Sequence, residues 1–275
     1  MGKARLRRWM LASAVALSLA LVPRVPGLPA AIPAFAAGAC ASNTTTQHYF
    51  SGWLDTTNAG WGSSAWITTH TPVFCTGTDP LGSNDFITAW SMIADSNSIG
   101  GNYAQSGWTI SRGQTTPQIF SEYTYTSCPF GFCDVFGPNT TGGQNFQYWQ
   151  DFDTCCNVRS IDMGYGSTLL DFTAYDPTNS NNGANSWPGP WQHQYYAETL
   201  NTANDMPGTA TNPTSFTSVA YLTTINTSGA YPPGFTGITA HSASSDKISQ
   251  WCVVAKSGTA FDLYTAGSCP TGTPS

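Results

Sequence analysis

The chain carries many short runs in which apolar and polar residues alternate, and turns rich in Gly, Pro and Asn separate these runs. A period of two residues is typical of a β-strand with one buried face, whereas helical periodicity is almost absent. The pattern therefore predicts β-strands near residues 46–54, 64–74, 86–94, 102–110, 118–126, 144–152, 158–164, 168–175, 193–199, 217–224, 248–255 and 260–265.

These strands favour an all-β fold, a two-sheet antiparallel β-sandwich or jelly roll with long polar loops. The polar loops at 176–191 and 201–216 are long enough that we expect them to carry function. We find no internal repeat and no linker, so the pattern predicts a single β-sandwich domain over 37–275. The last ~25 residues are expected to form either its final strands or a small appended hairpin.

Residues 102–110 and 118–126 are predicted to pair as a β-hairpin that carries an unusual glutamine. Alternation divides the first strand into one face with Tyr103, Gln105, Gly107 and Thr109 and a second face with Ala104, Ser106, Trp108 and Ile110. A primary amide beside a glycine is a poor choice for packing alone. Gln105 is therefore a candidate functional residue, against the alternative of a sheet glutamine that bonds to a neighbouring strand.

The first 36 residues have the composition of a signal peptide. The basic stretch KARLRR precedes an apolar segment and then small residues, so we expect cleavage after Ala36. The apolar segment is too short for a stable membrane span. The stretch AGAC at 37–40 could instead be a loose lipobox, the motif at which Cys40 would be lipidated, although Cys40 lies far beyond the apolar segment. We expect a secreted, extracellular protein without membrane association after cleavage.

Cleavage would change the charge of the protein. Five of the nine basic residues lie in the removed segment, and four remain against 15 acidic residues, which gives a net charge of −11. Such a surface repels nucleic acid and anionic membranes. It suits acid conditions, because protonation of the carboxylates removes self-repulsion.

All eight cysteines lie beyond the predicted cleavage site, and an even number in an exported chain predicts disulfide bonds. Cys155 and Cys156 are adjacent and would point to opposite faces of a strand, so we expect them to have different partners. The stretch CPFGFC at 128–133 could close on itself or pair with that doublet. The cysteine spacings are poor for tetrahedral zinc and the histidines are scattered, so no metal and no cofactor is expected.

The predicted mature chain contains only two glutamates, Glu122 and Glu198, beside thirteen aspartates. Glu122 lies on the return strand of the hairpin. Glu198 lies in QYYAETL, a strand that runs directly into the second long loop and in which Tyr196 shares its face. If the strands at 102–110 and 193–199 belong to one sheet, Gln105 and Glu198 can project into one groove. Otherwise Glu198 is a strand-end carboxylate that binds loop N–H groups.

Two segments resemble the eqolisins, the glutamic peptidases. AWSMIADSNSIGGNYAQSGWTISRGQTTPQIFSEYTYTS is similar to their tryptophan strand, Gln-Thr-Gly strand and aromatic Tyr-Glu-Trp strand. YYAETLNTANDMPGTATNPTSFTSV is similar to their second catalytic segment, in which a glutamate precedes a proline-containing loop. The resemblance implies a concanavalin A-like sandwich with Gln105 and Glu198 as catalytic residues. It extends equally to exported bacterial proteins of the same fold without known activity.

The implied mechanism is chemically sound under acid conditions. A carboxylate with a pKa near ~4.3 can act as general base toward a water. A neutral amide can hold the same water and donate to the developing oxyanion. The groove would need further walls and substrate contacts, for which Trp90, Trp108, Glu122 and Tyr196 are available. We expect a monomer that acts on an extracellular polypeptide.

The main alternative is a non-catalytic module that binds a polysaccharide or another surface. Ten tryptophans and twelve tyrosines could supply stacking platforms, and NSWPGPW places Trp187 and Trp191 in a loop where they could be exposed. A glycosidase would need two carboxyls about 5–5.5 Å apart, for which Asp151 and Asp153 are the nearest pair in sequence. A serine hydrolase is poorly supported because no G-x-S-x-G motif is present.

Overall fold

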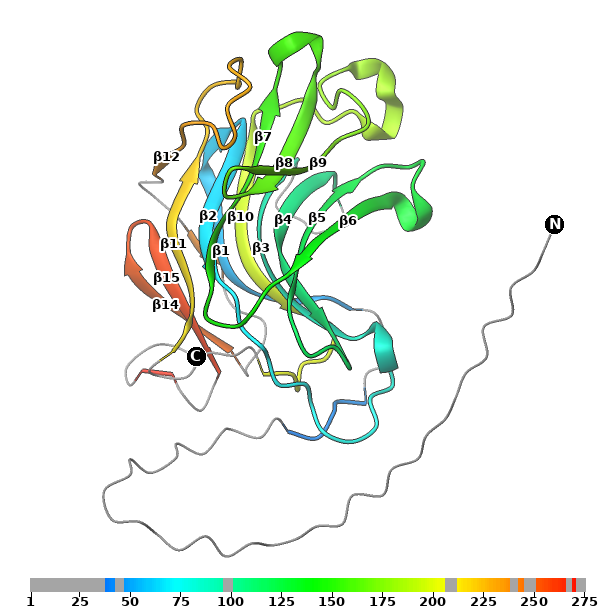
Figure 1. The fold of residues 1–275 in the computed structure, drawn as a ribbon, viewed down its shortest axis with the longest axis vertical. Coiled ribbons are helices and arrows are strands. Elements are labelled where there is room, and N and C mark those ends of the chain that lie inside the picture. The colour runs from blue at the N-terminus through cyan, green and yellow to red at the C-terminus, as the bar shows by residue number, and fades with distance from the viewer. Residues whose placement is uncertain are drawn as a thin grey trace, which may run out of the picture. The chain divides into compact units, whose positions relative to one another are not determined.

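The computed structural model describes residues 38–42, 47–95, 101–205, 212–237, 242–244, 251–265 and 269–270. Nearly all of its regular structure is β-strand, arranged as two antiparallel sheets (Figure 1). This confirms the two-sheet β-sandwich that the alternating pattern predicted. Over the same residues, no helix has the length and apolar character needed to cross a membrane.

The first sheet has seven strands and contains the predicted hairpin. Its order is β13 (Ser242–Ser244), β1 (Tyr49–Gly60), β10 (Trp191–Thr199), β3 (Phe86–Ala94), β4 (Tyr103–Ser111), β5 (Gln118–Thr124) and β6 (Phe132–Asn139). The sequence pattern did not predict β6 or the three-residue β13. β6 is an edge strand with a Gly-Pro pair and weak alternation, as edge strands often have.

The second sheet has eight strands. Its order is β14 (Trp251–Ser257), β15 (Ala260–Thr265), β11 (Thr214–Tyr221), β2 (Gly62–Thr68), β7 (Asn145–Asp153), β8 (Ser160–Tyr165) and β9 (Thr168–Phe172), with β12 (Thr236–Gly237) paired to β11. The C-terminal hairpin of β14 and β15 is hydrogen-bonded to β11, so it continues this sheet.

The inner faces of the two sheets form an aromatic core. Its buried rings come from both sheets and include Trp53, Trp108, Tyr148, Tyr195, Phe216, Trp251 and Phe261. Burial of a large apolar side chain contributes about 1.5–3 kcal/mol, so these rings account for much of the attraction between the sheets. A buried polar network also joins them: the Gln150 amide bonds to the hydroxyls of Ser63, Ser91 and Ser106 at 2.6–3.1 Å.

The expectation that Trp187 and Trp191 form an exposed platform is wrong. Their side chains are 2% and 1% exposed, and they belong to a second core cluster with Phe152 and Ile161. The Trp191 indole donates to the Trp187 carbonyl at 2.7 Å, which folds the loop back over the end of the sandwich. The binding-module alternative therefore loses the two rings on which it depended.

The glycosidase alternative loses its acidic pair. Asp151 is fully buried and accepts a 2.9 Å hydrogen bond from Asn226, whose amide also lies 3.4 Å from Asp153. Asp151 is inaccessible to solvent and is hydrogen-bonded to Asn226, so it cannot contact a bound sugar ring.

Four disulfide bonds pair all eight cysteines: Cys40–Cys75, Cys128–Cys133, Cys155–Cys156 and Cys252–Cys269. CPFGFC therefore closes on itself. We expected Cys155 and Cys156 to have different partners, and this expectation is wrong because it assumed that they lie in a β-strand. Residues Cys155–Asn157 form a short 3₁₀ turn in which Cys156 has a left-handed φ of 62°, so the two side chains do not alternate.

Candidate active site

Strand register collects Gln105, Glu122 and Glu198 on one face of the seven-stranded sheet. Met92 on β3 pairs with Gln105 on β4, and Gln105 pairs with Glu122 on β5. Glu198 lies on β10, on the other side of β3, where it pairs with Thr88. Directly paired residues share a face, so the period-two pattern brings the glutamine and both glutamates to the same surface.

This face is hollowed at its polar centre. Two adjoining cavities of about 70 and 250 Å³ share the side chains of His48, Tyr103, Gln105, Glu122 and Glu198. The smaller cavity is completed by Phe50, Trp90 and Met92, among others. The larger is completed mainly by Phe86, Thr88, Phe120, Phe132 and Phe136. The result is a groove with aromatic walls on either side of a cluster of ionisable and amide groups.

Glu198 is held by partners from two directions. The Trp90 indole N–H donates to its Oε2 at 2.8 Å, and Nδ1 of His48 contacts its Oε1. The Glu198 side chain is only 7% exposed. Behind it, the rings of Phe50, Trp90 and Tyr196 pack edge to face or tilted, with centroids 5.4–6.2 Å apart. The carboxylate is thus fixed in orientation before any ligand arrives.

Gln105 belongs to a second hydrogen-bonded group across β4 and β5. Its amide N–H donates to Oε1 of Glu122 at 3.1 Å, and the Tyr103 hydroxyl contacts the same oxygen. The pKa of Glu122 is raised to about 7, mainly by burial and also by the nearby charges of Glu198 and Asp134, while the hydrogen bonds from Tyr103 and Gln105 oppose the rise. Burial, followed by Glu122, also raises the pKa of Tyr103.

The structure therefore brings together Gln105, Glu122, Trp90 and Glu198. The Tyr196 ring, on the neighbouring strand, is tilted against that of Trp90, and Tyr196 is not among the residues that line the two cavities. The expectation that Trp108 lines the groove is wrong, because its ring is fully buried between the sheets and its indole donates to the Thr68 carbonyl at 3.2 Å. Alternation already placed Trp108 on the face opposite Gln105.

Sequence reasoning missed His48 and the role of Tyr103. His48 lies immediately before β1 in a segment without a motif, and 150 residues separate it from Glu198. Tyr103 shares the predicted face of Gln105, two residues away, which was a usable signal. Within the described residues, a cluster that could hold a metal consists of Cys40, Cys75 and Asp79, and its two sulfurs are bonded to each other.

Comparison with known proteins gives structural matches only, since no family model and no curated protein matches the chain. Two structures of scytalido-glutamic peptidase with transition-state analogues have 14% identity and TM-scores of 0.52 and 0.51. SCP-B, a member of the eqolisin family of peptidases in complex with a tripeptide, has 12% identity and a TM-score of 0.50. Each match covers 80% of this chain and 100% of the other. The fold that places Gln105 and Glu198 on one sheet face is therefore similar to that of the glutamic peptidases, as the two sequence motifs predicted.

Proposed function

We propose that this protein is a secreted glutamic endopeptidase that cleaves polypeptides under acid conditions, with Glu198 and Gln105 as its catalytic residues. The observation that carries the proposal is that these two side chains, from β10 and β4, line the same groove. The groove lies on a sandwich whose fold is similar to that of solved glutamic peptidases.

In the proposed reaction, Glu198 accepts a proton from a water molecule, and the water oxygen attacks the carbonyl carbon of the scissile peptide. The carbonyl π electrons move onto the oxygen, and the Gln105 amide N–H donates to this oxyanion. When the C–N bond breaks, Glu198 returns the proton to the leaving nitrogen. Gln105 suits the oxyanion role because an amide keeps its donor at every pH.

Glu122 supports this arrangement by orienting the Gln105 amide through their 3.1 Å hydrogen bond. With its pKa raised to about 7, Glu122 is uncharged at acid pH. It therefore does not add a second negative charge near the oxyanion, which would oppose catalysis. The aromatic walls of the groove favour substrates with apolar side chains on both sides of the scissile bond.

The test is a digestion of a denatured protein substrate, scanned from pH 2 to 7, with purified wild type and three variants. Wild type should cleave best at about pH 2–4. Glu198→Gln should abolish cleavage because it is nearly isosteric and removes the proton acceptor. Gln105→Ala should lower kcat/KM by ~10²–10³-fold through loss of the oxyanion donor. The double variant should be no worse than the poorer single variant, because both residues act on one water.

Gln47→Ala is the matched control, since Gln47 is an exposed glutamine outside the groove lining. Its activity should equal that of the wild type. Equal cleavage by wild type and Glu198→Gln would contradict the proposal, as would a correctly folded wild type that cleaves nothing between pH 2 and 7.

A further inference from the structure

The candidate site contains more than the Gln105–Glu198 pair, because His48 contacts the Glu198 carboxylate. Each carboxylate oxygen of Glu198 has its own partner: the neutral Trp90 indole on Oε2, at 2.8 Å, and the His48 ring on Oε1. Of these two partners only the histidine can carry a charge. The imidazole is 45% exposed and lies between solvent and the buried carboxylate.

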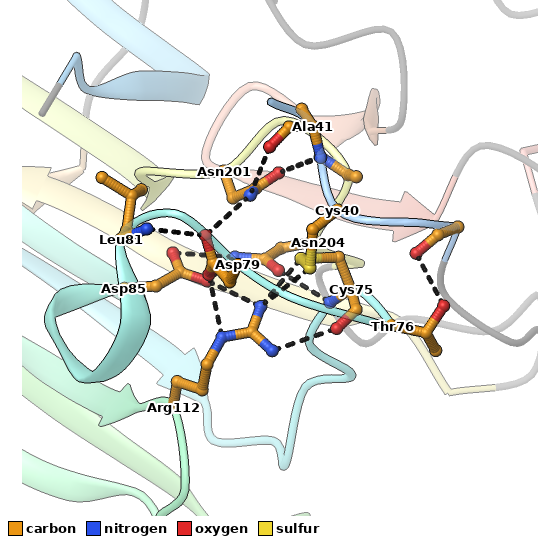
Figure 2. The surroundings of a disulfide bond; sticks show 12 residues. Cys40, Ala41, Cys75, Thr76, Asp79, Leu81, Asp85, Arg112, Asn201 and Asn204 are labelled. Carbon is orange, nitrogen blue, oxygen red and sulfur yellow. Dashed lines mark hydrogen bonds and ion pairs between the residues drawn. A yellow bond between two sulfur atoms is a disulfide. The ribbon is translucent and has the colours of Figure 1, made fainter. Parts of the chain in front are cut away.

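Ala41, which precedes His48 in the chain, lies beside Asn201, just after the end of β10 (Figure 2). Asn201, three residues after Glu198, accepts from the Ala41 N–H at 3.2 Å and donates to the Ala41 carbonyl at 3.5 Å. Cys40 is bonded to Cys75, and its N–H donates to the Thr76 carbonyl at 2.9 Å. These contacts attach Cys40 and Ala41 to the body of the sandwich.

A cluster of charged residues, Arg112, Asp79 and Asp85, lies beside the Cys40–Cys75 disulfide and the Asn201 contacts. Arg112 lies against the disulfide and donates to the Cys75 carbonyl at 3.0 Å, while its guanidinium forms ion pairs with Asp79 and Asp85 at 2.9 and 3.1 Å (Figure 2). Asp79 in turn accepts from Asn201 at 3.2 Å. The loop that carries Cys75, the start of the described chain and the end of β10 are thus joined in one network.

The electrostatic surroundings favour a charged His48. The hydrogen bond to Glu198 raises the pKa of His48, burial opposes the rise, and the charge of Glu198 on β10 supports it; Glu122 on β5 adds to the rise only at pH values where it is ionised. Tyr103 on β4 shares the cavity and is uncharged at acid pH, as a phenol is, while Phe50 and Phe86 flank the imidazole with centroids 6.1 and 6.0 Å away. Because the shift is upward, His48 carries its proton through the whole acid range.

We propose that His48 is a positioning residue whose imidazolium orients Glu198 through their contact at Oε1 and places a positive charge beside it, which extends peptidase activity to lower pH. This inference rests on the proposed function of Glu198 as general base. A general base must be ionised to accept a proton, and an adjacent cation favours the ionised form of a carboxylate. The groove would therefore owe its low-pH activity to a residue outside the two motif segments.

The first experiment tests the pair without using activity. The imidazole resonances of the mature protein are titrated by NMR, and the His48 resonance is assigned as the one that is missing in His48→Asn. His48 should titrate above its ordinary value of 6.5 in the wild type and at a lower pH in Glu198→Gln. A His48 that titrates identically in both proteins would overturn the proposal, whatever the peptidase activity is.

The second experiment measures kcat/KM against pH for wild type, His48→Asn, His48→Lys and the control Gln47→Ala. His48→Asn should lose about tenfold more activity at pH 3 than at pH 5.5, so that its acid limb moves to higher pH. His48→Lys, which keeps a positive charge, should recover part of that loss, and Gln47→Ala should match the wild type.

A loss in His48→Asn that is equal at every pH would indicate a structural role only and would overturn the proposal. An inactive but folded wild type would refute the proposed function and with it the catalytic role of His48. The NMR titration would still report whether the charged pair exists, so the two failures are distinguishable.

Discussion

At the scale of single residues, the two glutamates of the groove show how surroundings assign different tasks to the same side chain. Glu198 meets an indole N–H and a histidine, whereas Glu122 is buried beside a phenol and a primary amide. Burial raises the pKa of Glu122, whereas Glu198 is oriented by the partners on its two oxygens. This difference depends on neighbours from several strands, not on either local sequence.

The titration of Glu122 predicts a pH dependence of stability. Its pKa of about 7 in the folded protein lies above its ordinary value of 4.5. Between these values the unfolded chain releases a proton that the folded protein retains, so the free energy of unfolding should fall as pH rises from about 4.5 to 7. Glu122→Gln should remove this part of the slope, as measured by urea denaturation at pH 4, 5.5 and 7.

Other buried acids, such as Asp85 with a pKa raised to about 6, contribute a slope of the same sign. The informative quantity is therefore the difference between wild type and Glu122→Gln. If the free energies of unfolding of the two proteins change in parallel across this pH range, the expected titration of Glu122 is wrong.

At the scale of elements, the floor of the groove requires close contact between β3 and β4. Gly107 lies opposite Trp90 in this pair, and a Cβ at position 107 would lie 2.1 Å from the Ala89 carbonyl oxygen. A backbone atom cannot move away without breaking the ladder. Close packing of β3 against β4 therefore explains why residue 107 is a glycine, whatever the role of the Gln105 amide.

Gly107→Ala should destabilise the protein severely and disturb the groove, because the strands must separate to admit the methyl group. Gly258→Ala is the control, since nothing lies within 4 Å of a Cβ built there. Thermal denaturation of both variants checks this expectation. A Gly107→Ala melting temperature equal to that of the control would show that β3 and β4 can separate freely.

The loop at 176–191 behaves as part of the core, because its two tryptophans pack in a buried cluster with Phe152 and Ile161. Trp191→Ala should cost ~3–5 kcal/mol in the free energy of unfolding. Phe130→Ala should cost little, because the Phe130 side chain is 93% exposed. Chemical denaturation measures both values. A Trp191→Ala variant as stable as Phe130→Ala would restore the exposed-platform hypothesis.

At the scale of the whole molecule, the disulfide bonds differ in the length of chain that they close. Cys40–Cys75 spans 35 residues and Cys128–Cys133 spans 5. The loop-entropy relation gives roughly 4 kcal/mol for the first and roughly 2 kcal/mol for the second. Replacing both cysteines of the first pair by serine should therefore lower the melting temperature more than the same change in the second.

Non-reducing mass spectrometry of the intact protein should first establish that none of the eight cysteines is free. The two double-serine variants are then compared by calorimetry. Equal melting temperatures would mean that Cys40–Cys75 stabilises the protein no more than the five-residue loop does, and that Ala41 is held beside Asn201 mainly by hydrogen bonds.

Much of the fold and part of the site followed from the sequence, for a physical reason. Period-two alternation is a property of each strand by itself, so it predicted most of the strands and the shared face of Tyr103, Gln105 and Gly107. The motifs around Gln105 and Glu198 indicated the eqolisin-like sandwich. The same alternation placed Trp108 on the opposite face, and assigning it to the groove disregarded that information.

Only the tertiary structure decided which residues meet across long stretches of chain. Strand order places β3 between β10 and β4, which brings Glu198 to the groove of Gln105, and the pairing of β1 with β10 brings it to His48, 150 residues away. The burial of Trp187 and the turn that joins Cys155 to Cys156 also depend on how loops close over the sandwich. Alternation fixes a side chain's face within its own strand, but strand order and loop packing arise from contacts among all the elements together, which no local pattern encodes.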